Sequence, residues 1–303
     1  MIGQTSAGTE PRTPRNPYVV QNLRVWDGWA DHQAESEFYD LAGFRAGNNH
    51  LRPYELEEVG KVEGKKLLHL QCRFGTDSLS WARLGADVTG VDFAPSAIEV
   101  ARRLAADTGL DARFLAGDVY DLRPMESGGF DIVYTSRGVL CWLPDLDTWA
   151  EIIAEQLKPG GVFYLTEIHP VARMYEDEDG VSGLSLKYDY FGADRPLAFE
   201  ADLGASYATG DGSGANSPTD SITEPVKEPT TEPIYGWTHS MGAIVTALAS
   251  AGLRLEFLHE FPYCDWQLSF LHQTAENQWR RRPEIPVDIP LFFSLKASKP
   301  ATP

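Results

Sequence analysis

Short apolar runs and amphipathic segments alternate along the middle of the chain. Apolar runs bounded by turn residues predict buried strands at 66–70, 87–91, 112–115, 130–134 and 162–165. Helical spacing predicts helices at 77–84, from Pro95 onward and at 148–157. Strands that alternate with helices in this way predict an α/β fold with a doubly wound, mostly parallel sheet.

The end of the chain returns to the same kind of pattern. A helix is predicted at 240–251, and strands are predicted at 253–259 and 291–297. The two late strands, joined by a long irregular segment, predict an antiparallel hairpin at the edge of a seven-stranded sheet. Four regions are expected: an N-terminal arm with cap helices at 1–62, a core at 63–170, an inserted lid that covers the substrate at 171–236, and a C-terminal helix and strands that complete the sheet at 237–303.

Charge narrows the choice of partners. The 303 residues include 44 acidic and 26 basic ones, a net charge of −18, so we expect no nucleic-acid partner. Residues 171–233 hold 13 acidic and 4 basic residues and therefore half of that excess. Two interpretations stay open for this segment: a solvated surface, or a lid that attracts a cationic substrate.

Other features concern the cellular compartment. No run approaches the roughly 20 apolar residues that span a bilayer, so no membrane partner is expected. Residues 1–17 lack the apolar core of a signal peptide, and Cys72, Cys141 and Cys264 form no CxxC pair. We expect a cytoplasmic protein without a metal site, whose long arm would allow a homo-oligomer by exchange between subunits.

Two carboxylates follow neighbouring strands of the predicted sheet. In an open α/β sheet, ligands bind beyond the carboxyl ends of the strands, near the switch in strand order. Asp92 lies 17 residues after Gly75, a separation that suits a carboxylate binding ribose hydroxyls, and Asp118 could accept from an adenine amino group. Strand-end acids also cap helices or turns, but the pair together predicts a nucleoside site.

Two segments resemble class I S-adenosylmethionine-dependent methyltransferases. Residues 157–161 read Leu-Lys-Pro-Gly-Gly, and residues 68–72 read Leu-His-Leu-Gln-Cys, a start similar to that of a small-molecule subgroup. The family usually has an acidic residue followed by Gly-x-Gly-x-Gly, where this chain has His69, Gln71, Arg73 and Gly75. The resemblance implies S-adenosylmethionine as the cofactor and a small-molecule acceptor, methylated on oxygen, nitrogen or carbon, in secondary metabolism.

The resemblance also implies which residues bind the methyl donor. Aromatic rings could stabilise its sulfonium, and Phe93, Tyr134 and Trp142 are candidates, with core packing as the alternative that is favoured for each. Trp29 and Tyr39 could likewise close over the donor or simply pack the arm. The expected donor-binding residues are Leu70, Gln71, Cys72, Gly75, Asp92, Phe93, Asp118, Val119 and Ser136.

Nicotinamide dinucleotide binding is the main competing interpretation. It requires Gly-x-Gly-x-x-Gly, so that a helix N-terminus can receive a pyrophosphate. Asp77 instead places an acidic residue where that pyrophosphate would lie. S-adenosylmethionine has no phosphate, so the sequence favours the methyl donor.

Catalytic candidates follow the fifth predicted strand. His169 could remove a proton from the acceptor near neutral pH, and Glu167 could orient it or bind a substrate amine. A purely structural histidine is the alternative. Two further functions stay open: another reaction of the same donor, and donor binding without catalysis.

Overall fold

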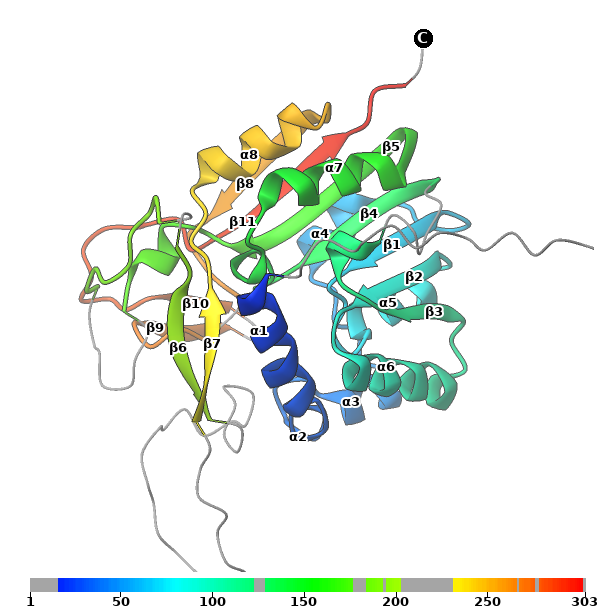
Figure 1. Ribbon diagram of the computed structural model, residues 1–303, viewed down its shortest axis with the longest axis horizontal. Helices are drawn as coiled ribbons and strands as arrows, with labels where there is room; N and C mark the ends of the chain where they lie inside the picture. The colour runs from blue at the N-terminus through cyan, green and yellow to red at the C-terminus, as the bar shows by residue number, and fades with distance from the viewer. Residues whose placement is uncertain are drawn as a thin grey trace, which may run out of the picture.

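A computed structural model describes residues 16–122, 129–176, 184–192, 195–202, 231–265, 267–275 and 278–301. Its centre is a seven-stranded sheet with helices on both faces (Figure 1). The first five strands in spatial order pair in parallel, while β11 runs antiparallel to both of its neighbours. The predicted α/β fold with an antiparallel pair at one edge is confirmed. The strands, in spatial order, are β3 (Ala112–Ala116), β2 (Asp87–Asp92), β1 (Lys66–Leu70), β4 (Phe130–Ser136), β5 (Leu157–Ile168), β11 (Phe292–Ser298) and β8 (Arg254–Phe261).

The sheet separates the apolar core on one of its faces from that on the other, and helices cover both. On one face of the sheet, Trp149 and Ile244 belong to the core beneath α7 and α8. On the other face, Trp81 of α5 is fully buried against β1, β2 and β4, and α6 packs over β3. The helices here are α4 (Pro53–Val59), α5 (Thr76–Arg83), α6 (Pro95–Thr108), α7 (Leu146–Gln156) and α8 (Met241–Ser250), with short 3-10 turns η1 (Val119–Asp121), η2 (Leu140–Trp142) and η3 (Ala172–Met174).

The N-terminal helices pack against a small hairpin that the sequence did not predict. The helices are α1 (Pro17–Gly28), α2 (Ala30–Ala34) and α3 (Leu41–Ala46), and the hairpin pairs β6 (Leu197–Asp202) with β7 (Thr231–Gly236). The Asn22 side chain donates to the Tyr235 carbonyl at 2.6 Å and accepts from the Tyr235 amide at 2.8 Å. No strand was predicted within 171–236, because the strands of this hairpin depend on contacts distant in the sequence.

A second hairpin, β9 (Leu271–Ala275) with β10 (Gln278–Arg281), lies beside the carboxyl end of the sheet (Figure 1). Residues 1–15 of the arm and residues 177–183, 193–194 and 203–230 of the predicted lid lie outside the described residues, and these parts of the lid hold 8 of the 13 acidic residues in 171–233. Among the helices that the structure describes, none has the length and apolar character needed to cross a bilayer.

Candidate functional site

A cavity of about 780 Å³ opens beyond the carboxyl ends of β1, β2 and β4. The strand order reverses here, because β1 lies between β2 and β4, and this is where open α/β sheets bind ligands. The volume lies within the range of small-molecule sites, about 300–1,000 Å³. Seven of the predicted donor-binding residues line it: Gln71, Cys72, Asp92, Phe93, Asp118, Val119 and Ser136.

Two predicted residues, Leu70 and Gly75, do not line the cavity. Leu70 is fully buried in the core below it. Gly75 has φ +72°, and a Cβ placed on it would lie 2.6 Å from the Phe114 ring, so it shapes the turn into α5. It therefore supports the binding loop from behind.

The loop after β1 keeps left-handed backbone positions without the expected glycines. Gln71 has φ +57° and Arg73 has φ +48°, in a region that side chains disfavour by about 1–2 kcal/mol. Amide hydrogen bonds to β2 hold the loop: Cys72 donates to the Val91 carbonyl at 2.9 Å, and Arg73 donates to the Asp92 carboxylate at 2.9 Å. The backbone shape is kept although two glycines are replaced.

Asp92 is held at the end of β2 by backbone donors. Its Oδ2 accepts from the Arg73 amide, and its Oδ1 accepts from the Ala94 amide at 3.0 Å. Burial raises the pKa of Asp92, while Arg73 and the two amides oppose this. Each carboxylate oxygen retains a further lone pair that could accept from a ligand hydroxyl.

Asp118 lies after β3 on the same cavity wall. Its Oδ1 accepts from the Tyr120 amide at 3.1 Å and caps η1. Asp92 and Asp118 thus share one cavity, with Phe93, Val119 and Trp142 among the other lining residues. The arrangement offers two acceptors and apolar surfaces to a flat, polar-edged ligand.

The aromatic candidates divide into two groups. Phe93, Trp142 and Tyr39 line the cavity, with Tyr39 packed edge-on against Phe74 at 4.7 Å between ring centroids. Tyr134 and Trp29 are buried and lie outside the lining. For these two, core packing is the interpretation that the geometry favours.

Arg73 connects the binding loop to the N-terminal helices. Its guanidinium donates to the Trp26 carbonyl at 3.2 Å and to the Gln33 side chain at 2.6 Å. It also stacks on the rings of Trp26 and Phe74, at 4.9 Å and 4.4 Å from their centroids. Arg73 therefore fastens α1 and α2 to the loop after β1.

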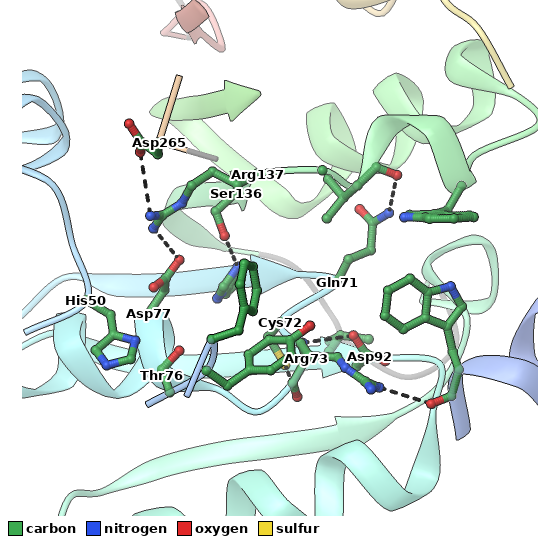
Figure 2. A pocket seen from close by; sticks show the side chains of 18 of the residues that line it. His50, Gln71, Cys72, Arg73, Thr76, Asp77, Asp92, Ser136, Arg137 and Asp265 are labelled. Atoms are coloured by element: carbon green, nitrogen blue, oxygen red, sulfur yellow. Dashed lines mark hydrogen bonds and ion pairs between the residues drawn. The ribbon is translucent and has the colours of Figure 1, made fainter. Parts of the chain in front are cut away.

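An ion-pair cluster at another end of the cavity was not predicted. Arg137, which directly follows β4, lies 2.7 Å from Asp77 of α5, 3.2 Å from Glu55 of α4 and 3.8 Å from Asp265 (Figure 2). Burial would raise the pKa of Asp77, but Arg137 outweighs it and holds that pKa below its usual range. Burial raises the pKa of Glu55 to about 7. The Asp77 signal was present in the sequence, but its partners come from distant elements.

His69 occupies the position where the related family usually has an acid. Its Nδ1 lies 2.8 Å from the Ser78 hydroxyl, and its Nε2 lies 3.2 Å from the Ser136 hydroxyl. Burial lowers the pKa of His69 to about 4, so the ring is neutral at physiological pH. The end of β1 therefore carries no charge.

The predicted catalytic pair, His169 and Glu167, lies outside this cavity. Glu167 accepts from the backbone amides of Gly138, Val139 and Leu140 at 2.8, 2.8 and 3.0 Å. His169 Nδ1 accepts from the Val171 amide at 3.0 Å, and its Nε2 lies 2.8 Å from Glu260. Both side chains thus have structural partners at the end of β5, which continues to Ile168 beside β11, and the geometry favours the structural alternative for His169.

The cover of the cavity also differs from expectation. Among the described residues of 171–236, none lines the cavity. Tyr39 of the arm, Gln273 of β9 and Trp279 of β10 line it instead. Substrate covering by the remainder of 171–236 stays a prediction. Cys72 is buried, and burial raises the pKa of its thiol, which makes it a poor nucleophile.

Known proteins match the central part of the chain in sequence. Residues 68–165 match the methyltransferase domain family. A ubiquinone biosynthesis O-methyltransferase of Xanthomonas euvesicatoria pv. vesicatoria is 33% identical over 137 residues, which is 44% of this chain and 57% of that protein. The protein with the same name from Photorhabdus laumondii is 35% identical over 162 residues, 51% of this chain and 65% of the relative. The matches thus span less than two thirds of either relative.

Solved structures share the fold across most of the chain. An S-adenosylmethionine-dependent methyltransferase from Mesorhizobium loti is 20% identical with a TM-score of 0.53, covering 84% of this chain and 99% of that one. One from Clostridium acetobutylicum is 12% identical with a TM-score of 0.51, covering 94% and 100%. The chain therefore has the Rossmann-like fold of these structures, and its residues 68–165 match the methyltransferase domain family.

Proposed function

We propose that this protein transfers a methyl group from S-adenosylmethionine to a small molecule. The observation that carries the proposal is the presence of Asp92 and Asp118 on the wall of one cavity at the switch point of the sheet. In this proposal Asp92 accepts from the ribose hydroxyls and Asp118 accepts from the adenine amino group. The match of residues 68–165 to the methyltransferase domain family supports it.

The charge of the cavity supports a cationic donor. Among the described residues, six carboxylates and three arginines line it, so the wall has an acidic excess. That excess suits a sulfonium and opposes the pyrophosphate of a dinucleotide. The charged lining residues are Glu37, Asp40, Asp77, Asp92, Asp118 and Asp265, with Arg52, Arg73 and Arg137.

The chemistry demands little covalent work from the protein. Methyl transfer is an in-line displacement whose leaving group is already activated by its positive charge. Alignment of donor and acceptor and exclusion of water supply the main acceleration. Phe93 and Trp142 line the cavity, and in this proposal the face of an aromatic ring stabilises the sulfonium.

The acceptor in this proposal is a small molecule with a hydroxyl group, and phenols are the first class to test. The relatives carry the name O-methyltransferase. Phe38, Tyr39 and Trp279 also line the cavity, and aromatic side chains suit a flat acceptor. Methylation of nitrogen or carbon, and a place in secondary metabolism, stay predictions from the sequence.

Calorimetry with S-adenosylhomocysteine tests the proposal. Asp92→Asn keeps the shape of the side chain but exchanges an acceptor for a donor, so we expect at least tenfold weaker binding, about 1.4 kcal/mol. Asp87→Asn, at the exposed start of the same strand, is the matched control and should bind as wild type. Unchanged affinity in a folded Asp92→Asn variant would refute the ribose assignment.

The reaction is tested with labelled S-adenosylmethionine and a panel of phenols, catechols and amines. Formation of S-adenosylhomocysteine together with a labelled acceptor identifies methyl transfer. A different nucleoside product would indicate another use of the donor. If neither S-adenosylmethionine nor S-adenosylhomocysteine binds at millimolar concentration, the proposed function is wrong.

A further inference from the structure

Asp77 and Arg137 form an ion pair on the wall of the proposed donor cavity. Asp77 lies in the first turn of α5, and Arg137 directly follows β4, so both side chains reach the cavity from the elements that flank β1. Their atoms Oδ2 and Nη2 are 2.7 Å apart. In Figure 2 the pair lies on one side of Cys72 and Asp92 lies on the other. The cavity therefore has an ionic end distinct from the end that contains Asp92.

The ionic end carries both signs of charge. Arg137 is shared among Asp77, Glu55 and Asp265, and Arg52 pairs with Asp265 at 3.2 Å. Three carboxyl groups thus surround two guanidinium groups, and Arg52, Asp77, Arg137 and Asp265 line the cavity. A ligand group with one positive and one negative charge fits such a wall without a net charge penalty.

Strand β1 has no carboxylate that could bind an ammonium group. His69, at the end of that strand, is neutral, and both of its ring nitrogens contact serine hydroxyls. Asp92 is bound by two backbone amides at the other end. Asp77 remains ionised beside Arg137 and lines the cavity one loop beyond His69. It is thus the carboxylate best placed to meet a cation near β1.

We propose that Asp77 and Arg137 together bind the amino-acid end of the donor. The Asp77 carboxylate accepts from the α-ammonium, and the Arg137 guanidinium donates to the α-carboxylate. This inference rests on the proposed function and assigns the part of the donor that Asp92 and Asp118 leave unassigned. It also gives Asp77 a role in ligand binding, because the carboxylate that would repel a pyrophosphate attracts an ammonium group.

Calorimetry with three nucleoside probes distinguishes the contribution of the α-ammonium from that of the α-carboxylate. S-adenosylhomocysteine has both groups, its decarboxylated analogue has only the ammonium, and 5′-methylthioadenosine has neither. We expect wild type to bind S-adenosylhomocysteine at least tenfold more tightly than 5′-methylthioadenosine. Asp77→Asn should weaken the first two probes at least tenfold and leave the third within twofold. Arg137→Gln should weaken only S-adenosylhomocysteine.

A surface ion pair provides matched controls. Asp31 and Arg103 are exposed and 3.9 Å apart, so Asp31→Asn and Arg103→Gln should leave the binding of all three probes unchanged. Thermal melting of each variant establishes that it is folded before its affinities are compared.

Two results would overturn the inference. One is wild type binding 5′-methylthioadenosine as tightly as S-adenosylhomocysteine, a comparison that needs no variant. The other is a folded Asp77→Asn protein in which all three probes weaken equally or none weakens. Failure of wild type to bind any of the three probes would instead refute the proposed function itself.

Discussion

Gly75 shapes the turn between β1 and α5, and Gly75→Ala is the perturbation that tests this most directly. Two separate costs apply. Its φ of +72° is unfavourable for alanine by about 1–2 kcal/mol. The new Cβ would also lie 2.6 Å from the Phe114 ring, which is buried at 3% exposure among residues of α5 and α6 and cannot move aside cheaply. Overpacking of this kind costs about 1–3 kcal/mol.

Two other glycines measure each cost alone. Gly109 has φ +65° with nothing within 4 Å of its virtual Cβ, so Gly109→Ala should cost only the backbone term, about 1–2 kcal/mol. Gly90 has no positive φ, but its Cβ would lie 2.8 Å from Phe114, so Gly90→Ala should cost about 1–3 kcal/mol through overpacking. Gly75→Ala should cost roughly the sum, about 2–5 kcal/mol.

Urea unfolding followed by circular dichroism measures all three variants against wild type. The double variant Gly75→Ala with Phe114→Leu should recover part of the overpacking term relative to Phe114→Leu alone. If Gly75→Ala destabilises the protein no more than Gly109→Ala does, the contact with Phe114 is not restrictive and the reasoning is wrong.

Two further predictions concern titratable groups. Because burial raises the folded-state pKa of Glu55 to about 7, above that of the unfolded chain, the folded state binds this proton more tightly. The contribution of Glu55 to stability should therefore fall between about pH 4.5 and 7, at about 1.4 kcal/mol per pKa unit, and the difference in unfolding free energy between wild type and Glu55→Gln across this window measures it. A difference that does not vary with pH would contradict the assignment. His169→Asn should lower stability by about 1 kcal/mol and leave affinity for S-adenosylhomocysteine and turnover unchanged, because His169 lies outside the cavity; lost turnover in a folded variant would restore it as a base.

The sequence predicted the place in the fold correctly for Asp92 and Asp118, which lie at or just after the ends of two strands of the parallel sheet. Parallel strands bring their carboxyl ends to one edge of the sheet. The positions of these two residues were therefore enough to assign them to one site. Strands β1, β4 and β11 were predictable because most of their residues are buried and apolar, whereas β3 and β8, at the two edges of the sheet, are largely exposed or half-buried. Local pattern was enough where burial and pairing act along a single strand.

Features assembled from distant segments were not predictable. Arg137 contacts Glu55, Asp77 and Asp265, which come from three other segments of the chain. No spacing in the sequence predicts that these four residues form a cluster. His169 follows the end of β5 at Ile168 but lies outside the cavity, which its position after a strand did not reveal. The His169 amide donates to the Leu291 carbonyl beside β11, on the antiparallel side of the sheet and away from the switch point.

The contacts of Arg73 have a consequence for the mechanical coupling between the N-terminal helices and the cavity wall. The same residue that supplies a left-handed backbone position beside Asp92 also holds the Trp26 carbonyl and the Gln33 side chain. Departure of α1 and α2 from the core must therefore break the guanidinium contacts, and any distortion of the loop must strain the same helices. The position of α1 and α2 and the shape of the loop beside Asp92 are thus linked through the Arg73 side chain, at a position where the related family usually has glycine.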